Sequence, residues 1–132
     1  MQDMRYLNLF SKVTNINTPY CIKYNNAIIF CIPKEFVMRA VGRDGENIRR
    51  LSEILGRRVR IIPSPRGLND ARGFIQTIVN PVTFKNLDIN GNEIILTAGG
   101  QSKAALIGRN KRRLLEMQRI VKDYFGKEFR II

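Results

Sequence analysis

The sequence contains no histidine and no tryptophan, and only 11 of its 132 residues are acidic. It also has no HxE or CxxC metal pattern, no Walker-type phosphate loop, and no Ser or Cys beside a recognisable base. The few carboxylates are scattered and show no conspicuous pairing for two-metal nuclease chemistry. We therefore expect a protein that is not an enzyme and that carries no metal and no cofactor.

Long apolar runs and a disulfide framework are also missing. Without an 18-residue apolar run or a signal-peptide pattern, we expect a soluble, cytoplasmic protein with no membrane partner. Two cysteines are too few for a disulfide framework. Cys21 and Cys31 flank a predicted hairpin, whose two-residue turn at Asn25-Asn26 would put them on opposite faces, whereas a three-residue loop would pair them. We expect free, buried thiols.

Positive charge is the most prominent feature that is present. Lys and Arg total 23, which gives a formal net charge of +12. Residues 39–66 carry +5 and residues 100–132 carry +6, while 1–38 carry +2 and 67–99 carry −1. Arginine outnumbers lysine 15 to 8, and its planar fork suits phosphates and stacks on bases. Clustering of this kind indicates a polyanionic partner rather than an evenly solvated surface.

The charge follows an internal repeat. Residues 40–62 read AVGRDGENIRRLSEILGRRVRII, and residues 106–132 read LIGRNKRRLLEMQRIVKDYFGKEFRII. Each copy runs from an apolar pair through Gly-Arg and an amphipathic helical pattern to a glycine and a strand ending Arg-Ile-Ile. The glycines lie 14 residues apart in the first copy and 18 in the second. Because four residues are close to one helical turn, the second helix can be longer without turning its apolar face.

Periodicity predicts the order α-β-β-α-α-β in each half, hence an α+β fold of two tandem domains, 1–63 and 64–132, each a three-stranded sheet covered by helices. The predicted elements of the first half are a helix at 4–13, a break at 14–19, strands at 20–24 and 27–32, a helix at 34–41, a helix ending at Gly56 with Ile48, Leu51, Ile54 and Leu55 inside, and a strand at 58–62. A linker follows at 63–67. The second half is predicted to have helices at 70–79, 101–107 and 111–125 and strands at 82–89, 93–98 and 127–131.

The Gly-Arg-Asp-Gly loop at Gly42, Arg43, Asp44 and Gly45 has chemistry suited to phosphate. Glycine lets the backbone approach a ligand and adopt positive φ, and the helix that follows offers unpaired N–H groups. A GxxG pair by itself is weak evidence, and a tight turn between helices also needs glycine. This loop joins two predicted helices, lies in a basic stretch and has a counterpart in the other half. These features favour a phosphate-contacting role over a purely structural turn.

This first copy resembles the core of a KH domain of the α-β-β-α-α-β (type II) kind. Two such domains in tandem resemble the archaeal NusA-like transcription termination/antitermination factors, over nearly the whole chain. The resemblance implies non-catalytic binding of single-stranded RNA, with RNA polymerase as a partner and a monomeric protein. In this family the GxxG loop clamps the RNA backbone. The residues that the resemblance assigns to RNA binding are Gly42, Arg43, Asp44, Gly45, Arg39, Arg49, Arg50, Gly108, Arg109, Asn110, Lys111, Arg112 and Arg113.

The chain departs from the family pattern at two positions. Asp44 places a carboxylate beside the expected phosphate path, which weakens binding unless it caps the next helix. Lys111 stands where the family has glycine, and a residue with a Cβ resists positive φ. We therefore expect the first loop to clamp RNA and the second to act through the charges of Arg109, Lys111, Arg112 and Arg113.

Two other classes of function fit parts of the sequence. The basic surface could dock on structured ribosomal RNA or on an acidic surface of RNA polymerase, with the glycine loop serving only the fold. Duplex-DNA recognition by the helix-loop-helix segment is less consistent with the preceding hairpin and the following strand. Preference for single strands and a steep salt dependence would distinguish an RNA clamp from protein docking.

Overall fold

The computed structural model describes residues 4–17 and 20–132. These residues form an α+β fold with six α-helices and two three-stranded sheets, as the sequence predicts at this level. The chain divides into two compact units, Met1–Ser64 and Pro65–Ile132. None of the helices in the described ranges combines the length and the apolar character that a membrane span requires.

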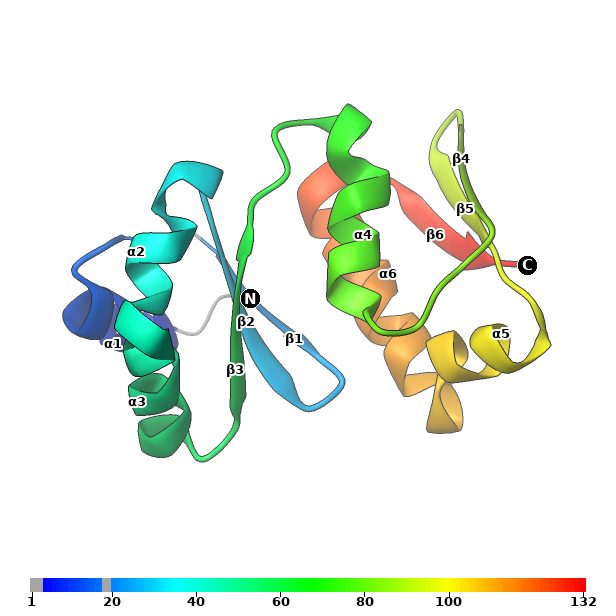
Figure 1. Cartoon of the computed structure of the whole chain (residues 1–132). Coiled ribbons are helices and arrows are strands. Elements are labelled where there is room, and N and C mark those ends of the chain that lie inside the picture. Colours follow the sequence, from blue (N-terminus) through cyan, green and yellow to red (C-terminus); the bar gives the residue numbers. More distant parts are fainter. Residues whose placement is uncertain (1–3, 18–19) are drawn as a thin grey trace. The chain divides into compact units, whose positions relative to one another are not determined.

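In the first unit, helices lie against one side of a three-stranded sheet (Figure 1). The predicted break after the first helix reaches Thr18 and Pro19, which lie outside the described residues. A 3₁₀ turn at Lys34–Phe36 precedes the second helix and another, Arg43–Gly45, forms the glycine loop. The elements are α1 (Met4–Thr14), β1 (Tyr20–Tyr24), β2 (Ala27–Ile32), α2 (Val37–Val41), α3 (Glu46–Leu55) and β3 (Arg58–Pro63).

The hairpin of the first unit has the predicted two-residue turn. Asn25 and Asn26 both have positive φ, and the pairing Tyr24↔Ala27 continues to Tyr20↔Cys31. Because Cys21 pairs with Phe30 rather than with Cys31, the two thiols lie on opposite faces of the sheet. Both are free and buried, which confirms the expectation.

The core of this unit contains alternate residues of β2 and one face of each helix. Phe10 of α1 packs on Phe30, with ring centroids 4.5 Å apart, and Leu51 of α3 is fully buried beside them. Ile48 and Leu55 are partly buried against this cluster, but Ile54 is 56% exposed, so its predicted inward position was wrong. Ile54 follows Leu51 by three residues. At about 100° per residue its side chain points about 60° away from that of Leu51, at the outer margin of the apolar stripe.

The second unit repeats this arrangement. Helix α4 contributes buried Phe74, Ile75 and Ile78, as predicted. Its first strand begins four residues later than expected, because Val82 bonds back to α4 instead of to the sheet: its N–H donates to the Val79 carbonyl and its own carbonyl accepts from Gln76. The elements are α4 (Ala71–Val79), β4 (Asn86–Asn90), β5 (Glu93–Thr97), α5 (Gly100–Ile107), α6 (Arg112–Phe125) and β6 (Glu128–Ile131).

The two units share their strand pairing. In each sheet the first two strands are antiparallel and the last lies parallel to the middle one, so that the order is β1-β2-β3 and β4-β5-β6. Ala27 pairs with Arg58 in the first unit, and the corresponding Glu93 pairs with Glu128 in the second. Helix α3 has 10 residues and α6 has 14, and both end at a left-handed glycine, Gly56 or Gly126. The four extra residues are therefore accommodated as one additional helical turn.

Candidate nucleic-acid interface

The first glycine loop is a tight left-handed turn between α2 and α3. Gly42 has φ 83° and ψ 169°, Asp44 has φ 55° and ψ 29°, and Gly45 has φ 75° and ψ 18°. The Gly45 N–H donates to the Gly42 carbonyl at 3.1 Å, which closes the turn. A Cβ on Gly42 would lie 3.0 Å from the backbone nitrogen of Asn47, so this position needs glycine for both its φ and its close contact.

The charged side chains of this first loop have mixed signs. Arg43 and Asp44 are both exposed, and Glu46 occupies the first turn of α3. Among the described residues no side chain caps α3, whose N-cap is Gly45, so Asp44 does not take the capping role that would remove its carboxylate from the loop. Two carboxylates therefore lie close in sequence to the single arginine of the loop.

Three further arginines predicted for this site differ in their surroundings. Arg39 is exposed on α2, and its guanidinium lies 5.1 Å from the centroid of the Phe36 ring. Arg49 donates from Nη1 to the Asp44 carbonyl, which braces the loop. Arg50 is exposed on α3. The structure therefore places all three near the loop in sequence and fold, but two of them already contact other groups of the first unit.

The second glycine loop has the same backbone, which corrects an expectation from the sequence. Gly108 has φ 76° and ψ 171°, Asn110 has φ 56° and ψ 28°, and Lys111 has φ 60° and ψ 20°. The Lys111 N–H donates to the Gly108 carbonyl at 3.1 Å, the same bond as in the first loop. Lys111 thus adopts the left-handed conformation of Gly45 despite its Cβ. The cost is about 1–2 kcal/mol, which the surrounding helices can offset.

The charges of this second loop all have one sign. Arg109, Lys111 and Arg112 are exposed, and within the first turn of α6 there is no acidic residue. Arg113 has a different environment from these three. It is half-buried, its Cγ lies under Gly108, and its Nη1 donates to the Ala105 carbonyl at 3.3 Å. Arg113 therefore supports the turn between α5 and α6.

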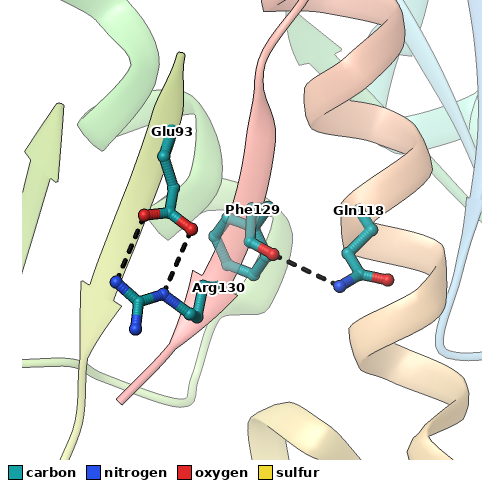
Figure 2. Close-up of polar contacts among 4 residues, drawn as sticks. All are labelled: Glu93, Gln118, Phe129 and Arg130. Carbon is teal, nitrogen blue, oxygen red and sulfur yellow. Dashed lines mark hydrogen bonds and ion pairs between the residues drawn. The ribbon is translucent and has the colours of Figure 1, made fainter. Parts of the chain in front are cut away.

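The rotation of α6 is fixed by contacts with the last strand. Figure 2 shows Gln118, whose Nε2 donates to the Phe129 carbonyl of β6 at 3.2 Å. Arg130 of the same strand forms an ion pair with Glu93 of β5, with N–O distances of 3.1 and 3.2 Å. Because Gln118 faces β6, its neighbour Arg119 is exposed. Arg119 was not among the residues predicted from the sequence, although its seven-residue spacing from Arg112 is a signal for a shared helix face.

The strand β3 adds cations to the first unit. Arg58 is exposed and Arg60 is half-buried. Val59 and Ile61, which alternate with these arginines, belong to the core, as the alternation predicts. Burial lowers the pKa of the Arg60 guanidinium, and the nearby charge of Arg58 lowers it further. Arginine nevertheless remains protonated in proteins. The outer side of β3 is thus basic.

The chain is similar to two archaeal proteins that carry the same name. It is 22% identical over 127 residues to the "Probable transcription termination protein NusA" of Methanocaldococcus jannaschii, an alignment covering 93% of this chain and 68% of that protein. It is 23% identical over 97 residues to the protein of that name from Methanococcus vannielii, covering 72% of this chain and 54% of the relative. No family model matches the chain.

The fold is also similar to a solved structure. The crystal structure of APE1850 superimposes with a TM-score of 0.65 over 98% of this chain and 96% of that chain, at 24% sequence identity. At this identity the match is evidence for the fold alone. These similarities show that the chain is a distant relative of archaeal proteins named NusA and has a fold similar to that of APE1850.

Proposed function

We propose that this chain is a non-catalytic RNA-binding protein of the archaeal NusA type, acting in transcription termination or antitermination. In this proposal residues 1–63 and 64–132 are two type II KH domains, and their glycine loops hold the backbone of single-stranded RNA. The observation that carries it is the recurrence of one exposed loop backbone, at Gly42–Gly45 and again at Gly108–Lys111, each beside arginines. The distant relatives named transcription termination protein support the biological setting.

Each loop suits a phosphodiester more than a base edge. Its backbone N–H groups and the start of the next helix favour anions, and arginine adds charge-assisted hydrogen bonds. Neither of these contacts reads sequence, so they position the RNA, and bases are then free to lie against the adjoining helix and strand. RNA polymerase is the protein partner that we propose, in the cytoplasm, with the chain acting as a monomer.

The test is fluorescence anisotropy with a fluorescein-labelled 12-nucleotide single-stranded RNA. If one loop clamps four nucleotides, affinity should fall about 50-fold between 50 and 200 mM salt, because each phosphate contact of a single strand contributes about −0.7 to the logarithmic slope. The double variant Arg43→Asp, Arg109→Asp should lose binding while its circular dichroism spectrum is unchanged. Equal affinity for duplex RNA, or a flat salt response, would contradict the proposal.

Docking on ribosomal RNA or RNA polymerase is the second candidate, and exposed apolar side chains favour it. Met38 of α2 is 87% exposed and Ile54 of α3 is 56% exposed. A protein partner would bury apolar groups of this kind. In that case Met38→Ser would weaken binding to RNA polymerase in a pull-down assay but leave the affinity for the 12-nucleotide RNA unchanged.

A further inference from the structure

The exposed face of α6 differs from that of α3 at positions that correspond in the repeat. Counting from Gly42 and Gly108, Glu46 and Glu53 of α3 correspond to Arg112 and Arg119 of α6. All four side chains are exposed. The two helices follow the same loop and the same sheet order, so the change of sign is a difference in surface and not in fold.

The cations of the second unit extend from its loop along one side of α6, on which Glu116 also lies. Arg112, Leu115 and Arg119 are exposed and follow a three-then-four spacing, which places them on one side of α6. Arg112 and Arg119 are separated by about 10 Å along the helix axis, at 1.5 Å per residue. Arg109 and Lys111 extend the charge into the loop. We call Arg109, Lys111, Arg112 and Arg119 the basic face of the second unit.

Two acids, Glu116 and Asp123, lie on α6 within four residues of Arg112 and Arg119, whereas the loop cations Arg109 and Lys111 have no acid within four residues. None of the four side chains of the basic face has a hydrogen bond or ion pair with residues 4–17 or 20–132. The next cation along α6, Lys122, is paired with Glu128 at 3.2 Å, which ends the surface. In the first unit, by contrast, Arg43 has two acids, Asp44 and Glu46, within three residues.

The position of this charge is unfavourable for the isolated fold. A helix start carries partial positive charge, so acids stabilise it, as Glu46 does for α3, and cations destabilise it. At α6 the same positions carry Lys111 and Arg112, and Lys111 also occupies a conformation for which glycine is better suited. Local rules broken together at exposed positions indicate a role outside folding. An external polyanion would supply the missing counter-charge.

We propose that the basic face of the second unit is the main phosphate-binding surface of this protein and that it holds the backbone of single-stranded RNA. The inference rests on the proposed function, and it reverses the assignment expected from the glycine pattern, in which the first loop clamps. Leu115 supports a nucleotide over a simple anion. It is 59% exposed between two arginines, so the flat face of a base can lie on it while phosphates contact Arg112 and Arg119.

The experiment compares charge reversals with a matched control in the full chain. Arg112→Glu with Arg119→Glu places on α6 the glutamates that α3 has at the corresponding positions, although α6 keeps Glu116 where α3 has Arg50. Lys12→Glu with Lys34→Glu makes the same change in net charge at exposed positions outside both loops. The third variant is Arg43→Glu. Each variant and the wild type are titrated against a fluorescein-labelled 12-nucleotide oligouridine at salt concentrations from 50 to 200 mM, with polyaspartate as a competitor.

We expect the α6 pair to weaken binding at least about tenfold and to lower the logarithmic salt slope by about 1.4, as two lost phosphate contacts require. The Lys12/Lys34 control should change affinity by about threefold or less, and Arg43→Glu should weaken binding less than the α6 pair does. The reverse exchange, Glu46→Arg with Glu53→Arg, should strengthen binding.

Other outcomes separate the two proposals. If Arg43→Glu abolishes binding and the α6 pair only matches the Lys12/Lys34 control, the protein binds RNA but the inference is wrong. If the wild-type protein fails to bind the RNA, the proposed function itself fails. If polyaspartate displaces the RNA at equal charge concentration, the basic face fits an acidic protein, which also overturns the inference. Circular dichroism and thermal melting confirm that each variant is folded.

Discussion

The two glycine loops have nearly the same backbone but different charge, which is of mixed sign in the first and positive in the second. Gly42–Gly45 has two glycines and is accompanied by Arg43, Asp44 and Glu46, whereas Gly108–Lys111 has one glycine and is accompanied only by cations. The first loop therefore fits a backbone clamp by its residue pattern, and the second fits a polyanion by its electrostatics. Conformation and charge are separate requirements of a phosphate site, and in this chain they are met best by different copies of the repeat.

The largest effects on stability are expected at a core position that the two copies of the repeat share. Leu51 of α3 and its counterpart Met117 of α6 are 0% and 2% exposed. Substituting alanine at either should lower the free energy of unfolding by about 2–5 kcal/mol, because a cavity is left. Denaturant titration checks this, with Ile54→Ala as the control at about 0.5 kcal/mol or less. A large loss at Ile54 would contradict its exposed position.

Alanine at the first glycine of each loop tests whether the turns are equally constrained. A Cβ at position 42 would lie 3.0 Å from a backbone nitrogen, and one at 108 would lie 3.2 Å from the corresponding atom and 3.0 Å from the Cγ of Arg113. Both substitutions also force alanine into positive φ. We expect each to cost about 1–3 kcal/mol, with the larger loss at Gly42. Equal thermal stability of Gly42→Ala and wild type would show that the turn is not held as described.

Lys111→Gly separates conformation from charge within one residue. Glycine removes a left-handed penalty of about 1–2 kcal/mol but adds unfolded-state entropy of about 0.4–1, so the protein should be more stable by about 0.5–1 kcal/mol. RNA affinity should fall about twofold to threefold, because one cation is lost. Thermal melting and anisotropy measure the two effects. Stronger RNA binding by this variant would mean that backbone shape, not charge, limits the second loop.

The smallest expected effect concerns the helix starts. In backgrounds that neutralise the residue one turn further on, Glu116→Gln and Arg50→Gln, Arg112→Glu should stabilise α6 by about 0.5 kcal/mol and Glu46→Arg should destabilise α3 by a similar amount, because only the acid complements the helix dipole. Both changes should diminish at high salt, since surface charges are screened. Denaturant titration at 20 and 500 mM salt checks this. Effects of the same sign at both positions would remove the electrostatic contrast between the loops.

Much of the fold was predictable because its signals are local. The hairpin turn at Asn25-Asn26, the helix end at Gly56 and the one-turn difference between α3 and α6 follow from residue types and spacing. The errors fell where tertiary contacts compete with local pattern. Ile54 has an apolar side chain at helical spacing but lies outside the core, and Val82 has strand propensity but bonds to the end of α4.

The position of the candidate site was predictable from the sequence, but the contacts that its arginines make within the protein were not. Its loops were located from glycine and arginine, yet Arg113 contacts the Ala105 carbonyl and Arg39 lies over Phe36, which no spacing indicates. Arg119 was missed because its relevance depends on which side of α6 is exposed. That rotation is set by contacts such as the bond between Gln118 and the Phe129 carbonyl.

The sequence by itself determined the repeat, the order of elements and the uneven distribution of charge, because periodicity, glycine and net charge are properties of short stretches. Only the tertiary structure decided the conformation of Lys111 and the exposure of Arg112 and Arg119. A left-handed lysine is locally unfavourable, and it persists because α5, α6 and the sheet fix the two ends of the turn. The physical reason is that packing energy from many residues can outweigh the preference of one.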